Sequence, residues 1–177
     1  MAIVLGNNSI TGAASIFGTG AVAGITQNAN GIVNFPYVPV FQAYGTADGT
    51  YADENEVHWG SIQVNVGGHY DASNGRFTAP VAGQYQFYTS TIGASANDVY
   101  RYFFRRNGTN LGSGRHLRLD NISTGSEYGT NFANSIMVTL SASDYVSIYF
   151  SSDSGNSTYP AGNSTTHYSY FSGYLVI

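Results

Sequence analysis

The chain has 177 residues, a formal net charge of −4 at pH 7 and no cysteine. This length suffices for one well-buried core, the charge leaves no basic footprint for nucleic acid, and the lack of cysteine excludes disulfide bonds and thiolate chemistry. Aromatic residues make up 15% of the chain and charged residues only 9%, so the composition indicates a folded protein whose surface is kept soluble by hydroxyl and amide groups.

Residues 1–36 form an uncharged N-terminal arm, because the first charged residue is Asp48. The arm lacks both the period of an amphipathic helix and the pattern of a signal peptide or membrane span, so we expect no membrane insertion. Apolar, amide-rich segments of this kind usually become ordered against a neighbouring strand or chain, and a poorly ordered terminus is the alternative. We expect the arm to be an anchor. Its larger apolar residues are Ile10, Phe17, Ile25, Ile32 and Phe35.

Residues 37–177 show an all-β pattern of short β-branched or aromatic runs, each bounded by Gly, Asn, Asp, Ser or Pro. Several runs alternate strictly: Ile136, Val138 and Leu140 share one face, and the alternate residues of 146–150 do the same. No helical pattern competes with them. The pattern predicts one jelly-roll β-sandwich as the head of the molecule.

Tyrosine recurs on the side of several strands that faces away from the expected core. A lone sandwich buries only one face of each sheet, and large exposed aromatic patches are unusual on monomers. Tyrosine brings much contact area and keeps a polar tip, which suits an interface. We therefore expect one face of the sandwich to be buried between subunits of a homo-oligomer, with a sugar-binding face of stacked tyrosines as the alternative. The tyrosines assigned to this interface are Tyr145, Tyr149, Tyr168, Tyr170 and Tyr174.

All six cationic residues are arginines, and five of them fall within residues 101–118. Such a cluster allows two interpretations: a phosphate or carboxylate site, or guanidinium groups stacked on neighbouring tyrosine and phenylalanine rings. We favour stacking. The five residues are Arg101, Arg105, Arg106, Arg115 and Arg118.

No group of residues has the spacing of a catalytic or metal site. The four histidines lie in different runs, and none pairs with a second ligand at zinc-like spacing. They are His58, His69, His116 and His167. The acidic residues Asp53, Glu54, Glu56 and Asp71 lack the alternating pattern of a calcium loop, so we expect a solvated acidic loop. We expect no cofactor, no metal and no enzymatic activity.

One stretch combines aromatic residues with regularly placed turn residues: NVGGHYDASNGRFTAPVAGQYQFYTSTIG, from Asn65 to Gly93. Within it, PVAG predicts a tight turn in which Pro80 fixes φ and Gly83 frees it. A second motif, YFSGYLVI, closes the chain. The residues that carry the two motifs are Asn65, Tyr70, Phe77, Gly83, Tyr85, Phe87, Phe171 and Gly173.

At this spacing, residues 38–177 resemble the complement 1q globular-head family. Two positions depart from its signature, since Trp59 stands where the family has its leading Phe, and Thr89 where it has a final Phe or Tyr. The resemblance implies a tumour-necrosis-factor-like jelly roll of ten strands, assembled as a tight trimer. It also implies a binding or structural head, because members of the family are not enzymes.

The arm resembles the N-termini of small structural proteins of marine and freshwater tailed phages, in which a short uncharged arm precedes a head of this type. This second resemblance implies a virion structural protein: a trimeric decoration, or cement, protein on the capsid exterior, assembled in the host cytoplasm. The expected partners are further copies of the chain and the major capsid protein or another virion protein. The alternative is the receptor-binding head of a tail or head fibre, whose loops contact host surface glycans.

Overall fold

The computed structural model describes residues 26–27, 33–34, 38–45, 53–92, 99–112, 116–119, 131–153, 155 and 169–176. The chain divides into two compact units, Met1–Val38 and Pro39–Ile177. In the first unit, β1 (Thr26–Gln27) pairs antiparallel with β2 (Val33–Asn34). The five residues expected to form the anchor lie outside the described residues.

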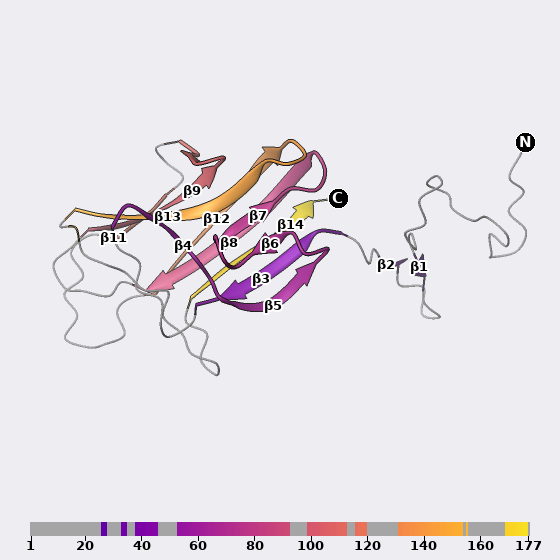
Figure 1. The fold of residues 1–177 in the computed structure, drawn as a ribbon, viewed down its shortest axis with the longest axis horizontal. Coiled ribbons are helices and arrows are strands. Elements are labelled where there is room, and N and C mark those ends of the chain that lie inside the picture. The colour runs from indigo at the N-terminus through magenta and orange to yellow at the C-terminus, as the bar shows by residue number, and fades with distance from the viewer. Residues whose placement is uncertain are drawn as a thin grey trace, which may run out of the picture. The chain divides into compact units, whose positions relative to one another are not determined.

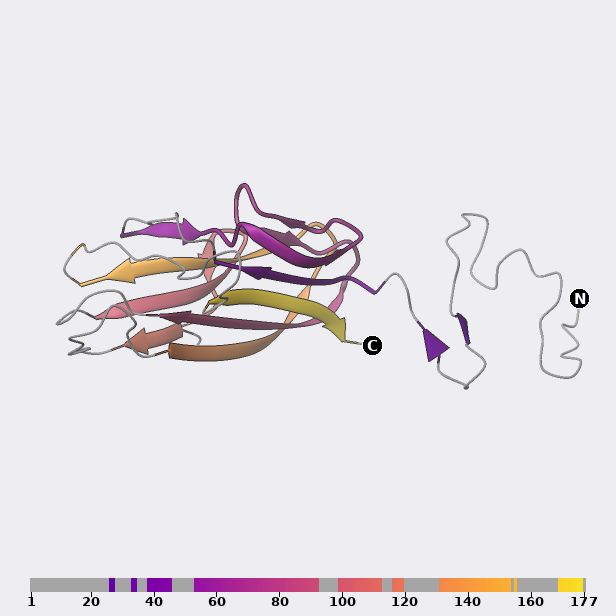
Figure 2. The same ribbon diagram turned by 90° about the horizontal axis from the view of Figure 1, so that it is seen from below.

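The second unit consists of two antiparallel sheets, which Figures 1 and 2 show as two layers. The five-stranded sheet has the order β12-β8-β14-β3-β5. Its strands are β3 (Val40–Tyr44), β5 (Ser61–Val66), β8 (Gly83–Ile92), β12 (Asn131–Leu140) and β14 (Tyr170–Val176). The described residues contain no helix, and so none that could span a membrane.

The seven-stranded sheet has the order β10-β9-β13-β7-β6, with β11 paired to β9 and β4 paired to β13. Its strands are β4 (Asn55–Val57), β6 (Tyr70–Asp71), β7 (Arg76–Thr78), β9 (Tyr100–Arg106), β10 (Thr109–Asn110), β11 (His116–Leu119) and β13 (Tyr145–Ser152). The resemblance implied ten strands, whereas the described part of the head has twelve strand segments, β3 to β14. The two-residue segments β6 and β10 account for the difference.

Strand alternation places one face of each sheet in the core, as the sequence predicts. Ile136, Val138 and Leu140 are buried, and so are the alternate residues Val146 to Phe150 of β13. Tyr88, on the opposite side of β8, is exposed. Because the apolar residues of each strand recur every second position, the two sheets can bury them against one another in a single layer.

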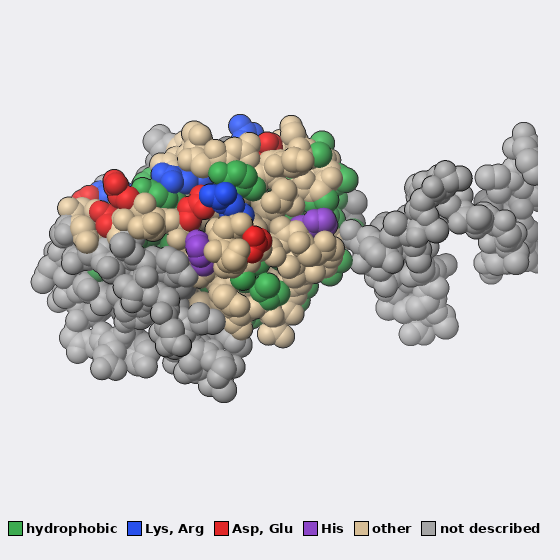
Figure 3. Space-filling view, in the orientation of Figure 1, with side chains coloured by type: hydrophobic (Ala, Val, Ile, Leu, Met, Phe, Trp, Pro, Cys, Tyr) green, Lys and Arg blue, Asp and Glu red, His purple; other side chains and the backbone are tan. Residues whose placement is uncertain are grey.

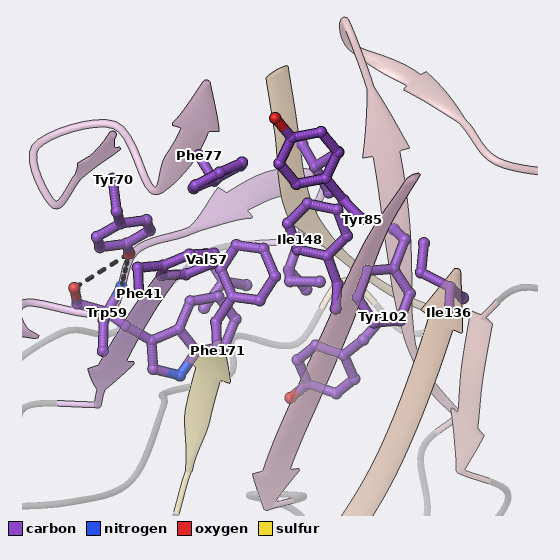
Figure 4. Packing of buried hydrophobic residues seen from close by; sticks show 14 of the residues in the cluster. Phe41, Val57, Trp59, Tyr70, Phe77, Tyr85, Tyr102, Ile136, Ile148 and Phe171 are labelled. Carbon is purple, nitrogen blue, oxygen red and sulfur yellow. Dashed lines mark hydrogen bonds between the residues drawn. The ribbon is translucent and has the colours of Figure 1, made fainter. Parts of the chain in front are cut away.

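Aromatic rings fill the middle of the sandwich, as Figure 4 shows. The ring of Phe41 lies at their centre, with centroid distances of 4.8 Å to Tyr70, 5.0 Å to Phe77 and 4.9 Å to Phe171. These rings come from both sheets, so one cluster of side chains joins the two layers. Each ring withdrawn from water contributes about 1.5–3 kcal/mol of favourable transfer free energy.

Candidate interaction surfaces

Two of the motif residues, Asn65 and Tyr70, connect segments of both sheets by hydrogen bonds. Asn65 fixes the chain that follows β5: its side-chain amide donates to the carbonyl of Tyr70 over 2.8 Å and accepts from the N–H of Tyr70 over 3.0 Å. The Tyr70 hydroxyl in turn donates to the carbonyl of Trp59 and accepts from its N–H, both at 3.1 Å (Figure 4). Three segments of chain are thereby held together around one buried ring.

Gly173 is required because a ring occupies the place of its side chain. A β-carbon there would lie 2.7 Å from Cε1 of Phe87 and 3.0 Å from the carbonyl oxygen of Gln86. Across the sheet, Gly173 belongs to one row of paired positions that face the core. In order, the row is Asn65, Phe41, Gly173, Phe87 and Ile136. Gly173 thus leaves space for the ring of its neighbour Phe87.

Gly83 does not have the backbone conformation that was expected of it. Gly83 was expected to free the backbone of a turn, but it begins strand β8 and is absent from the residues with positive φ. A β-carbon at this position would meet the side-chain end of Leu175 at 2.7 Å. Gly83 therefore leaves space for the end of the Leu175 side chain and does not adopt a positive φ.

The outward side of the five-stranded sheet, here called the five-stranded face, lacks charge. None of the residues in its strands is Asp, Glu, Lys or Arg. Of the large apolar side chains that are exposed in the described part of the chain, all except Val81 lie on this sheet. They are Ile62, Tyr88, Met137 and Tyr174, of which Ile62 pairs with the core-facing Ala43 and the other three point outward. An uncharged surface with exposed aromatic and aliphatic groups is the composition of an interface core.

Two of these side chains are paired on the surface. The rings of Tyr88 and Tyr174 stack with a centroid distance of 6.3 Å and an interplanar angle of 22°. A hydrogen bond with the Tyr174 side chain is the main reason that the pKa of Tyr88 is raised above its ordinary value. Tyr170 on the same strand is half-buried. The five-stranded face therefore presents a fixed aromatic platform.

The five predicted interface tyrosines do not share one face of the sandwich. Tyr170 and Tyr174 lie in β14 of the five-stranded sheet, whereas Tyr145 and Tyr149 lie in β13 of the seven-stranded sheet. Tyr168 lies outside the described residues. The prediction of a single tyrosine face is thus wrong, because alternation shows which side of a strand points outward but not the sheet to which the strand belongs.

The outward side of the seven-stranded sheet, here called the seven-stranded face, gives the β13 tyrosines partners within the chain. The Arg76 guanidinium carbon lies 4.4 Å from the centroid of the Tyr145 ring, and the same guanidinium forms an ion pair with Glu56 at 2.9 Å. The other oxygen of Glu56 accepts from the hydroxyl of Ser147 at 3.0 Å. Ser147 points outward and is nevertheless fully buried under these groups.

The arginines of β9 continue the seven-stranded face. Arg105 lies over the Tyr149 ring, 3.1 Å from its centroid, so the predicted stacking is confirmed for this residue. Arg101 instead forms an ion pair with Asp153, and Arg106 donates to the carbonyl of Thr139 at 3.4 Å. Arg118 belongs to β11, and Arg115 lies outside the described residues. Figure 3 shows basic and acidic side chains side by side on one side of the head.

The acidic residues considered for calcium are engaged separately with their own surroundings. Asp53 accepts from the backbone N–H of Ser152, and Asp71 accepts from the side chains of Ser73 and Asn74. The hydrogen bonds from Ser73 are the main reason that the pKa of Asp71 lies below its usual value. Within the described ranges, no three potential ligands come together as a metal site would require.

The described histidines likewise do not come together as a metal site. Desolvation lowers the pKa of His58 below 6.5, against the opposing effect of Glu56. His69 packs edge-on against Phe77 with a centroid distance of 6.4 Å. His116 belongs to β11, and His167 lies outside the described residues.

The sequence of the head agrees with a known domain family. Residues 40–176 match the model of the C1q domain, from the first residue of β3 to the last residue of β14. The chain belongs to the C1q domain family. C1q domains are in general binding or structural domains rather than enzymes, and they typically form homotrimers.

Solved structures of this fold agree with the assignment to the C1q family. The globular domain of zebrafish complement 1qA is 17% identical with a TM-score of 0.51, and the similarity covers 79% of this chain and 98% of that one. Murine APRIL, crystallised at pH 5.0, is 15% identical with a TM-score of 0.53, covering 78% of this chain and 99% of that one. The comparison with curated protein sequences finds no match. At these identities the likeness concerns the fold.

Within the C1q fold, the motif residues have a structural role. The two bonds from Asn65 to Tyr70 and the space left by Gly173 are parts of the C1q head that hold its layers together. Asn65 is half-buried and Gly173 is buried, so these features explain the shape of the head and not its partner. The partner must be sought on the two outward faces and in the arm.

Proposed function

We propose that the chain is a homotrimeric virion structural protein, a capsid decoration protein whose five-stranded face joins the subunits and whose residues 1–36 bind the capsid. The observation that carries the self-association is the uncharged five-stranded face with its exposed Tyr88, Met137 and Tyr174. All described charged side chains of the head lie on the seven-stranded sheet or in the turns beside it. This division leaves one face suited to burial and the other suited to water.

The arm supports the second half of the proposal by its composition. It precedes the first charged residue, Asp48, and the C1q match begins only at residue 40. An uncharged, partly apolar segment outside the domain core can bury its apolar side chains and pair its backbone by adding to strands of another protein. The major capsid protein, present in many copies, is the expected partner.

Removal of the arm tests the anchor. The chain lacking residues 1–36 is expected to remain a folded trimer and to lose binding to capsids that have been stripped of this protein, as measured by co-sedimentation. A matched full-length variant, Phe17→Ala with Phe35→Ala, should reduce capsid binding without changing the mass of the trimer. Unchanged co-sedimentation of the shortened chain would contradict the proposal.

Copy number tests the location. Quantitative mass spectrometry of purified virions should find the chain within a few-fold of the major capsid protein. A few trimers per particle would contradict a shell location. Such a low copy number would favour the second candidate, a receptor-binding head on a fibre. The observation that supports this candidate is the seven-stranded face, on which arginines stack on tyrosine rings. That candidate requires the isolated protein to block adsorption of the virion to host cells.

A further inference from the structure

The seven-stranded face holds one arginine in a fixed position on β9, next to the edge strand β10. Arg105 and Tyr149 lie on the adjacent strands β9 and β13, and the guanidinium carbon is 3.1 Å from the centroid of the ring. The Nε–H of Arg105 donates to the side-chain oxygen of Asn110, its paired residue on β10, at 2.7 Å. Contacts with a ring below and an amide beside it fix both the plane and the direction of this guanidinium.

Arg105 differs from Arg76 and Arg101 in having no carboxylate partner in the described part of the chain. Arg76 is paired with Glu56 and Arg101 with Asp153. Among the residues that the structure describes, no carboxylate oxygen lies within 4.0 Å of Arg105. The remaining contacts of Arg105 are with a neutral amide and an aromatic ring. A positive charge is therefore held on a face on which Arg76 and Arg101 are paired with carboxylates.

The position of this charge determines the chemistry that it can recognise. Because Nε is already used, the two terminal nitrogens of Arg105 remain as donors in one plane. Two parallel N–H donors match the two oxygens of a carboxylate. Since the side chain is already ordered, binding does not have to immobilise it, and that saves part of the usual entropic cost.

The location in the sheet restricts the carrier of the carboxylate. At Arg105 both neighbouring positions are occupied, by Asn110 of β10 and Ser147 of β13, so a peptide strand cannot pair with Arg105 itself. Recognition must use side chains: the Asn110 amide, the edge of Tyr149 and the half-buried ring of Phe103, 6.4 Å from Tyr149. Flat rings, amides and hydroxyls arranged on an open surface suit a sugar ring with its many hydroxyl groups.

Because the ordered guanidinium of Arg105 lacks a carboxylate partner, we infer that the Arg105–Tyr149–Asn110 cluster is a binding site for an acidic saccharide. The sugar carboxylate would pair with the terminal nitrogens of Arg105. The inference concerns the face opposite to the one used for self-association. It does not depend on the arm or on the capsid. It goes beyond a decoration role, because it gives the outward surface of the assembled protein a ligand.

Isothermal titration of the full chain with trigalacturonic acid tests the inference, and the neutral methyl ester of the same trisaccharide is the control ligand. We expect saturable binding of the acid and none of the ester. Arg105→Lys keeps the charge but loses the paired donors, so Kd should rise about tenfold. Arg105→Met should abolish measurable binding. The matched control is Arg101→Met, which removes an arginine already paired with Asp153 and should leave Kd unchanged.

A second measurement guards against loss of folding in the variants. In the wild-type chain, the Nε–H resonance of Arg105 should shift on titration with the acid, while that of Arg101 should not. Equal binding of the ester, an unchanged Kd in Arg105→Met, or no shift of the Arg105 resonance would each overturn the inference. Equally tight binding of triglutamate would overturn its saccharide part, because it would show that the carboxylate alone is recognised.

Discussion

Replacement of Gly173 by alanine is the sharpest test of how the head is packed. The new methyl group would lie 2.7 Å from Cε1 of Phe87 and 3.0 Å from the Gln86 carbonyl oxygen, both well inside van der Waals contact. Phe87 is fully buried, and its ring packs on Phe171 with a centroid distance of 6.0 Å, so it has little room to withdraw. We expect the free energy of unfolding to fall by about 3 kcal/mol, the upper part of the range for overpacking.

Urea denaturation at one fixed protein concentration measures this loss, because self-association makes stability depend on concentration. The single tryptophan, Trp59, is fully buried in the same core and reports unfolding by its fluorescence. The same loss should lower Tm by about 6–12 °C in a chain of this size. Gly83→Ala is the matched control, since its methyl group would come too close only to the end of the flexible Leu175 side chain, with Tyr85 at ordinary contact distance. It should cost less than about 1 kcal/mol.

A double-mutant cycle identifies the cause of the destabilisation. Phe87→Leu shortens the obstructing ring and alone should cost about 1–2 kcal/mol. Combined with Gly173→Ala, it should be less destabilising than the sum of the two changes by about 1–2 kcal/mol, because the methyl group then fills space that the ring has left. Additive effects, or a Gly173→Ala variant as stable as the wild type, would refute the packing argument.

Three further results are expected. Asn65→Ala removes both bonds to the Tyr70 backbone and should lower the free energy of unfolding by about 2 kcal/mol in the same urea assay. The pKa of Asp144 is lowered below 3.8, chiefly by its bond from Asn107, so its stabilising effect is present above pH 3.8 and is lost as the pH falls through the folded-state pKa; Tm measured from pH 7 to pH 3 should fall less steeply in Asp144→Asn. Tyr174→Asp should give monomers in analytical ultracentrifugation, whereas a trimer from this variant would exclude the five-stranded face as the interface.

The burial of individual residues could be predicted from the sequence, because alternation along a strand is local. Tyr85 and Phe87 were expected on one side of β8 and Tyr88 on the other, and the first two are fully buried while the third is exposed. The C1q fold could also be recognised, since its motif residues make contacts that few other residues can replace. The two hydrogen bonds of Asn65 to one backbone residue are an example.

The faces could not be assigned in the same way. Tyr149 and Tyr174 both alternate away from the core, but β13 pairs with β4, β7 and β9, while β14 pairs with β3 and β8. Those pairings depend on contacts between residues far apart in the chain. The stacking of arginines on aromatic rings was expected for residues 101–118, yet the stack of Arg76 on Tyr145 joins distant strands and has no local signal. The absence of charge from five strands is visible in the sequence, but it acquires meaning only when those strands form one sheet.

Because the charged side chains lie with one sheet only, added salt should affect contacts made by the seven-stranded face and not those made by the five-stranded face. Contacts through the five-stranded face involve no ions of the chain, so added salt cannot screen them. Contacts that depend on Arg105 weaken as the Debye length falls from about 10 Å at 0.1 M to about 3 Å at 1 M salt. In a titration with sodium chloride, we therefore expect a ligand bound at Arg105 to be released, whereas a trimer joined through the five-stranded face is expected to stay intact.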